Sequence, residues 1–136
     1  MILVLNFGGQ YSHLIVRRVR DLGVYSEILP CDASIKEIKK LKPEGIILSG
    51  GPSSVYMHNS PTMDKKILDL GIPILGICYG LQLIAKFVGG EVLGGKMKEF
   101  GKKILHVKKN GTLLKGLSKR EQVWMSHGDL VAKLPL

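Results

Sequence analysis

Short apolar runs alternate with amphipathic stretches over residues 1–90 of the chain. The apolar runs have the length of buried strands, and they cover residues 2–5, 25–29, 45–49 and 74–77. Between them, apolar residues recur at helical spacing, which predicts helices over 12–22, 34–41, 60–70 and 79–88. Ser34 to Glu37 reads as a capping box for the second of these helices, and Ser60-Pro61 as the start of the third. Because apolar strands alternate with helices, we expect a mostly parallel sheet with helices on both faces, a three-layer α/β fold.

The pattern changes after Gly89-Gly90. Residues 91–93, 103–108 and 122–125 read as strands separated by short turns, with some alternation of apolar and polar positions. These stretches predict short antiparallel strands that extend the sheet. No repeat, linker or low-complexity tract interrupts the sequence, so we expect a single domain over residues 1–136.

Composition narrows the class of protein. The chain has 136 residues, of which 45% are hydrophobic, enough for one globular core. No apolar run approaches the ~20 residues of a membrane span, and the apolar N-terminus predicts a first strand rather than a signal peptide. Only two cysteines occur, Cys31 and Cys78, so we expect neither a disulfide framework nor a metal site, and a reduced, cytoplasmic setting.

The formal net charge of +9 is concentrated in one segment. Residues 96–120 carry nine Lys and Arg against Glu99 alone, whereas residues 1–95 carry ten basic and eight acidic residues. This basic segment is either a solvated lysine face or a docking surface for an acidic partner. Only Phe100 interrupts the lysines, so the segment lacks the aromatic platform of a nucleic-acid-binding surface.

Residues 76–80, Gly-Ile-Cys-Tyr-Gly, carry the strongest chemical signal. A glycine on either side of Cys78, between a predicted strand and a predicted helix, is typical of the cysteine form of a nucleophile elbow. The helix that follows aims its N-terminal N–H groups at the sulfur, which stabilises negative charge there. We therefore predict that Cys78 is a nucleophile. Cys31 lacks this context, and we expect it to be structural.

Two further groups lie within reach of this elbow in the predicted fold. The glycine pair Gly50-Gly51 follows a strand, so the N–H of Gly51 and that of Tyr79 could form an oxyanion hole beside Cys78. Gln82 comes one helical turn after Cys78, where it either contacts a polar substrate or is a solvated helix residue. No phosphate-binding glycine motif follows the first strand, so nucleotide binding by this chain is not indicated.

A cysteine nucleophile needs a general base, usually a histidine that a carboxylate orients. The chain offers His13, His58, His106 and His127. His127-Gly128-Asp129 places an acid two residues after a histidine and forms a possible dyad, although such pairs are common in loops without catalytic meaning. We expect His106 to be exposed on a lysine-rich strand.

Together these motifs resemble the class I glutamine amidotransferases, and most closely the glutaminase parts of the GMP synthase branch. Residues 76–82 are similar to the family's nucleophile segment, and residues 49–54 to its oxyanion loop with Gly-Gly-Pro. Residues 6–11, Arg17–Arg20 and Val123–Asp129 also resemble this branch. The resemblance implies a flavodoxin-like fold.

The resemblance also implies roles. Cys78 would attack the side-chain amide of glutamine and form a glutamyl thioester, with Gly51 and Tyr79 holding the oxyanion. Residues that would help to hold the glutamine are Gly50, Gln82, Ser126, His127, Gly128 and Asp129. The ammonia would pass to an ATP-pyrophosphatase partner that aminates XMP to GMP. ATP and magnesium are expected on that partner, and segment 96–120 is a candidate for docking to it.

One departure from the family limits the expectation. Its catalytic base and acid lie in a His-Pro-Glu segment downstream of Ser-His-Gly-Asp, and residues 130–136 contain no such segment. We therefore expect a C-terminally incomplete domain, which lacks a triad as it stands. The alternatives are a non-catalytic protein with a binding or regulatory role, and another elbow-cysteine hydrolase of the same fold.

Overall fold

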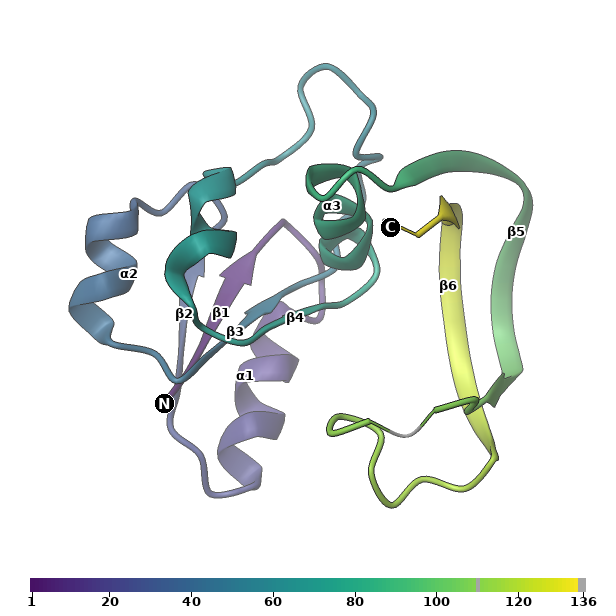
Figure 1. Cartoon of the computed structure of the whole chain (residues 1–136), viewed down its shortest axis with the longest axis horizontal. Helices are drawn as coiled ribbons and strands as arrows, with labels where there is room; N and C mark the ends of the chain where they lie inside the picture. The colour runs from purple at the N-terminus through teal and green to yellow at the C-terminus, as the bar shows by residue number, and fades with distance from the viewer. Residues whose placement is uncertain (110, 135–136) are drawn as a thin grey trace. The chain divides into compact units, whose positions relative to one another are not determined.

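The computed structural model describes residues 1–109 and 111–134, and within β5 it leaves out the side chains of residues 95–98. It divides into two compact units, Met1–Leu93 with Val131–Leu136, and Gly94–Leu130. The elements, labelled in Figure 1, are β1 (Ile2–Asn6), α1 (Ser12–Asp21), β2 (Ser26–Pro30), α2 (Ile35–Leu41), β3 (Gly45–Leu48), η1 (Lys65–Leu70), β4 (Ile74–Gly76), α3 (Tyr79–Phe87), β5 (Glu91–His106) and β6 (Arg120–Lys133).

A four-stranded parallel sheet in the order β2-β1-β3-β4 forms the centre of the first unit. In its register Leu5 lies opposite Leu48, and Leu48 opposite Gly76. The four strands coincide with the four predicted apolar runs to within about one residue, because a strand covered on both faces has to be apolar nearly throughout. The prediction of a mostly parallel α/β sheet is confirmed.

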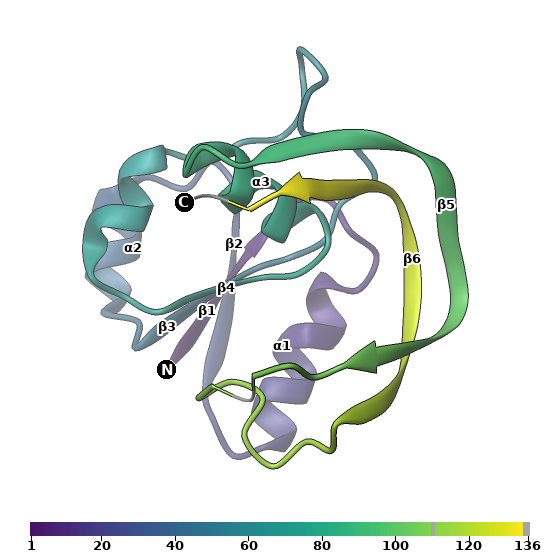
Figure 2. The same ribbon diagram turned by 45° about the vertical axis from the view of Figure 1, so that its right-hand side comes forward.

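Helices cover both faces of this sheet (Figure 2). On one face, Leu3, Leu5 and Leu48 pack in one cluster with Ile38 of α2 and Ile67 of η1, and α3 joins the same cluster. On the other face α1 contacts β1 and β2, and the buried Ser26 hydroxyl donates to the Val16 carbonyl oxygen at 2.9 Å. No helix among the described residues is long and apolar enough to cross a membrane.

One predicted helix differs from the structure. The segment over 60–70 is a 3₁₀-helix that begins only at Lys65. The Ser60 hydroxyl bonds back to the Met57 carbonyl oxygen at 2.8 Å instead of capping the residues that follow it. Asp64 is the cap, since its carboxylate accepts the Lys66 N–H at 2.9 Å. By contrast, the capping box predicted from Ser34 and Glu37 is present at the start of α2.

The C-terminal strands also differ in extent from the expectation. Antiparallel pairing is confirmed, but β5 and β6 are two long strands, and in the described residues they form a sheet of their own rather than an extension of the parallel one. Residues 91–133 contain no proline, so every residue there retains the main-chain N–H that a ladder requires. Strand β5 therefore continues through the lysines and glycines that separate the predicted short strands.

Candidate functional site

Three loops meet at the carboxyl edge of the parallel sheet, where open α/β folds place their sites. They follow β1, β3 and β4, which are neighbours in the sheet. A Cβ added to Gly50 would lie 3.6 Å from the Cys78 Cβ, and one added to Gly51 would lie 3.4 Å from the Phe7 Cβ. The loop after β3 is therefore in contact with the nucleophile segment, as expected from the sequence, and also with the first loop.

Cys78 has the strained backbone that the elbow motif predicts. Its φ of 48° and ψ of −108° lie in a region that non-glycine residues seldom adopt, and a residue held there costs about 1–3 kcal/mol. It is the N-cap of α3, and the residue is exposed. The surrounding structure thus holds the thiol out of the sheet edge at the start of a helix.

The glycines on either side of Cys78 are required by close main-chain approach. A Cβ on Gly76 would lie 2.5 Å from the Leu81 nitrogen, and a Cβ on Gly80 would lie 2.5 Å from the Leu48 carbonyl oxygen. The Gly80 N–H donates to the Ser49 carbonyl oxygen at 3.2 Å and to the Ile77 carbonyl oxygen at 3.0 Å. Helix α3 therefore begins directly against the end of β3, which fixes where the elbow lies.

The two predicted oxyanion donors are both at this edge. Tyr79 is the first residue of α3, so its N–H has no acceptor within the helix. Within the described part of the chain, the Gly51 N–H has no main-chain acceptor either. Gly51 follows Gly50, whose added Cβ would contact the Cys78 side chain, and Tyr79 directly follows Cys78 in the chain. Their role in binding an oxyanion stays a prediction.

The Tyr79 side chain is a feature that sequence reasoning missed. It is 2% exposed, its ring packs against that of Phe7 with centroids 5.4 Å apart, and its hydroxyl donates to the Pro61 carbonyl oxygen. Burial raises the pKa of this phenol above its usual value. The ring therefore ties the residue after the nucleophile to the first loop. An aromatic residue directly after Cys78 was the available signal.

Gln82 lies one turn into α3, where its N–H donates to the Cys78 carbonyl oxygen at 3.1 Å. Because the residue is only 7% exposed, the alternative of a solvated helix residue is wrong. A buried amide close to the nucleophile is compatible with contact to a polar substrate, and that contact stays a prediction.

The predicted glutamine-contacting residues Ser126, His127, Gly128 and Asp129 lie on β6 in the second unit. The His127 ring makes its Nδ1 hydrogen bond, 2.9 Å, with the main-chain oxygen of Asp129. Its Nε2 lies 3.2 Å from the Glu99 carboxylate, which is also 3.6 Å from the Lys103 ammonium. A carboxylate partner of His127 is thus Glu99, which sequence reasoning missed, although it is the one acid in the basic segment.

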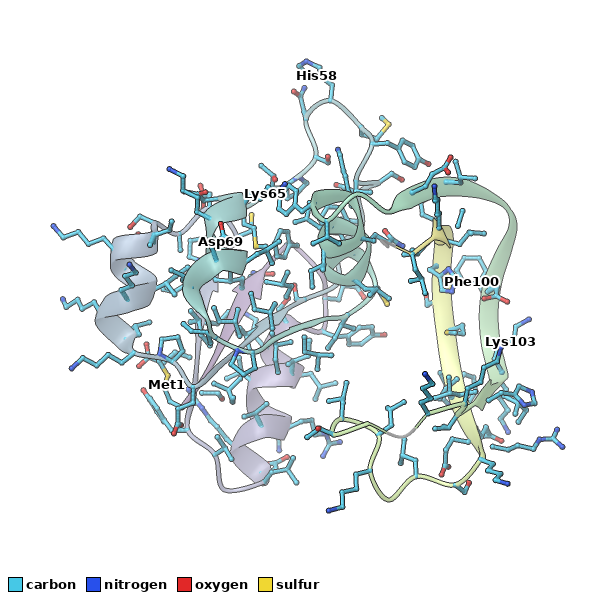
Figure 3. All side chains as sticks on the ribbon, in the orientation of Figure 1. Met1, His58, Lys65, Asp69, Phe100 and Lys103 are labelled. Carbon is cyan, nitrogen blue, oxygen red and sulfur yellow. The ribbon has the colours of Figure 1, made fainter. Side chains whose placement is uncertain are left out.

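Within the described residues, the other three histidines form no ion pair with an acidic side chain. His13 and His106 are exposed, as expected for His106. His58 is at the tip of the loop between β3 and η1, where its Nδ1 contacts the Asn59 side-chain oxygen at 3.0 Å (Figure 3). Over residues 1–109 and 111–134, no three His, Cys, Asp or Glu side chains cluster so as to hold a metal ion.

Comparison with known proteins decides the family. The profile of glutamine amidotransferase class-I matches residues 3–136. The chain belongs to this family. A GMP synthase [glutamine-hydrolyzing] of Natranaerobius thermophilus is 52% identical over 135 residues, which are 99% of this chain and 26% of that protein. The Aquifex aeolicus GMP synthase [glutamine-hydrolyzing] is 54% identical over 134 residues, 98% of this chain and 26% of its own length.

A solved structure extends the likeness to the fold of this amidotransferase domain. A Thermoplasma acidophilum protein assigned as one of the subunits of a GMP synthase superposes with a TM-score of 0.81 at 35% identity, over 98% of this chain and 67% of that one. The resemblance to the GMP synthase branch and the predicted flavodoxin-like fold are therefore confirmed. The chain spans about a quarter of the length of the curated relatives it matches.

The close approach at Gly80 makes a stability prediction for this amidotransferase domain. Gly80→Ala should lower the free energy of unfolding by about 3 kcal/mol, because three atoms of Leu48 lie within 3 Å of the added Cβ. Gly71→Ala is the control, since its φ of 70° strains the backbone but nothing lies within 4 Å, and it should cost about 1 kcal/mol. Urea denaturation measures both, and equal losses would show that the elbow can shift to accommodate a side chain.

The two thiols should differ in reactivity. Cys31 is half-buried, and burial followed by the charge of Asp32 raises its pKa, so less thiolate is present at neutral pH. Iodoacetamide at pH 7 should therefore alkylate the exposed Cys78 first, and alkylation of Cys31 should accelerate as pH rises toward its raised pKa. Peptide mapping by mass spectrometry reads each site, with Cys78→Ser as control. Equal rates at pH 7 would contradict this.

Proposed function

We propose that this chain is the glutaminase part of a GMP synthase, with Cys78 as the nucleophile. The observation that carries the proposal is the strained, exposed Cys78 at the start of α3, beside the Gly50-Gly51 loop, in a chain of this family. The thiolate attacks the side-chain carbonyl carbon of glutamine and forms a tetrahedral oxyanion. The C–N bond then breaks, the leaving nitrogen takes up the proton that the Cys78 thiol gave up, and ammonia departs. Water then cleaves the glutamyl thioester to glutamate and returns a proton to the sulfur.

The oxyanion of both tetrahedral intermediates would be held by the N–H groups of Gly51 and Tyr79. Two donors from different segments can converge on one oxygen while the substrate carbon sits at the sulfur. Loss of one such donor typically costs about 10²–10³-fold in kcat. The close main-chain contacts of the glycines around Cys78 would therefore support catalysis by keeping these donors in place.

The remaining predicted residues would bind glutamine and the partner. Gly50 faces the Cys78 Cβ and Gln82 lies on the helix that follows it, so both are placed to contact a bound amide side chain. Ser126, His127, Gly128 and Asp129 would help to hold the glutamine. The ammonia would pass to an ATP-pyrophosphatase partner, which holds ATP and magnesium and aminates XMP to GMP. Segment 96–120 supplies positive charge for docking to it.

A cysteine substitution pair tests the chemistry. In the full-length protein with its partner, Cys78→Ala should lower the rate of glutamate release by about 10⁴-fold or more, since the thioester cannot form. Cys31→Ala should leave that rate within about twofold, because Cys31 packs against the hydrophobic core. Glutamate release is measured by a coupled assay. Persistent hydrolysis in Cys78→Ala would refute the proposal, as would a wild-type protein without activity.

Substrate identity needs a separate measurement. A glutamine-like electrophile should label Cys78 covalently, and free glutamine should block the labelling, because both occupy the same pocket. Glutamate and asparagine serve as controls, since they present a different head group or a shorter side chain. Labelling that glutamine does not block would favour another elbow-cysteine hydrolase of the same fold.

A further inference from the structure

The hydroxyl of Ser49 lies between two main-chain groups at the edge of the proposed site. The hydroxyl oxygen accepts the Phe7 N–H at 3.0 Å, and the hydroxyl O–H donates to the Gly50 carbonyl oxygen at 2.9 Å. Ser49 is 0% exposed. We propose that Ser49 is a positioning residue that orients the Gly50–Gly51 peptide and thereby aims the Gly51 N–H at the oxyanion. This inference rests on the proposed glutaminase function.

The Ser49 hydroxyl acts on the Gly51 N–H through a single peptide group. The Gly50 carbonyl and the Gly51 N–H belong to one planar peptide group, in which a trans bond points them in opposite directions. A hydrogen bond that fixes the carbonyl therefore also fixes the direction of the N–H. The Ser49 hydroxyl does not touch the substrate in this scheme, and it acts only through the peptide it holds.

The position of Ser49 is itself fixed on both sides of its backbone. Its N–H donates to the Leu5 carbonyl oxygen at 3.0 Å, in continuation of the β1–β3 pairing. Its carbonyl oxygen accepts the Gly80 N–H at 3.2 Å, from the first turn of α3. One serine thus joins the first loop, the oxyanion loop and the nucleophile helix, so its hydroxyl is held in a defined place relative to Cys78.

The chain of hydrogen bonds also strengthens the donor. The Phe7 N–H polarises the Ser49 hydroxyl, which polarises the Gly50 carbonyl, and this withdraws electron density from the Gly51 N–H. Successive hydrogen bonds in a buried chain reinforce one another in this way. Gly9 closes the other side, since a Cβ there would lie 2.9 Å from the Gly50 carbonyl carbon. The peptide therefore has little room to rotate away.

Ser26 offers a matched control for the ordinary cost of losing a buried hydroxyl. It is also 0% exposed, and its hydroxyl also donates to a main-chain oxygen at 2.9 Å, that of Val16. It is the first residue of β2 and so lies at the amino end of the parallel strands, whereas the loops that meet at Cys78 follow their carboxyl ends. Ser26→Ala and Ser49→Ala remove the same kind of bond in different places.

The experiment compares these variants in the full-length protein with its partner. Ser49→Ala should lower kcat for glutamine about 10–100-fold with KM within about twofold, because the oxyanion contact exists only in the transition states. Alkylation of Cys78 by iodoacetamide should stay within about twofold, since displacement at a saturated carbon forms no oxyanion. Ser49→Thr keeps the hydroxyl and should restore most of kcat. Ser26→Ala should keep kcat within about twofold at a similar loss of stability.

Rates are expressed per alkylatable Cys78, so that a partly unfolded variant does not mimic a slow one. An unchanged kcat in Ser49→Ala, or an equal fall in kcat and in the alkylation rate, would overturn the positioning role while leaving the glutaminase function intact. If Ser49→Ala does not fold, the Ser49→Thr protein provides the test. The positioning role would be overturned if that protein had wild-type KM and stability but a kcat as low as that of an oxyanion-hole variant. A wild-type protein that does not hydrolyse glutamine would overturn the function itself, and the inference with it.

Discussion

The close main-chain approach around Cys78 is the constraint on which the rest of the site depends. Gly80 lies against the end of β3, and its N–H bonds to the Ser49 carbonyl oxygen, so helix α3 starts where the oxyanion loop begins. Next to this contact, Cys78 adopts a backbone conformation that is uncommon for a residue with a side chain, with a φ of 48°. The strain is sustained because the parallel sheet and the buried Tyr79 hold both sides of the turn.

Rigidity at this edge serves chemistry that needs fixed donors. An oxyanion is stabilised best by N–H groups that do not have to reorient when the charge forms. The Ser49 hydroxyl, the Gly9 backbone and the first turn of α3 limit motion of the groups around Cys78. The same contacts join the loop after β1 to the loop after β3, so the stability of the fold and the geometry of the site rest on shared residues.

The second unit has a different character. Strand β6 alternates between exposed and half-buried positions, and Trp124 is exposed with the Lys102 ammonium 5.8 Å from its ring centroid. His127 is held by Glu99 and by the Asp129 main chain, in a strand otherwise rich in exposed side chains. Among the residues of this unit that the structure describes, only Val107 is buried, so the order of the unit depends mainly on strand pairing. This is the part of the chain that carries the concentrated positive charge.

The sequence by itself indicated the parallel strands, the capping box at Ser34 and the elbow at Cys78, because the signal for each of them lies within a few neighbouring residues. It did not determine the late start of η1 at Lys65, the length of β5, the Glu99 partner of His127 or the Ser49 bridge. Those features depend on which atoms of distant segments are brought together. Only the tertiary structure sets such distances, since a hydroxyl, carboxylate or strand edge bonds to whichever partner the fold places within reach.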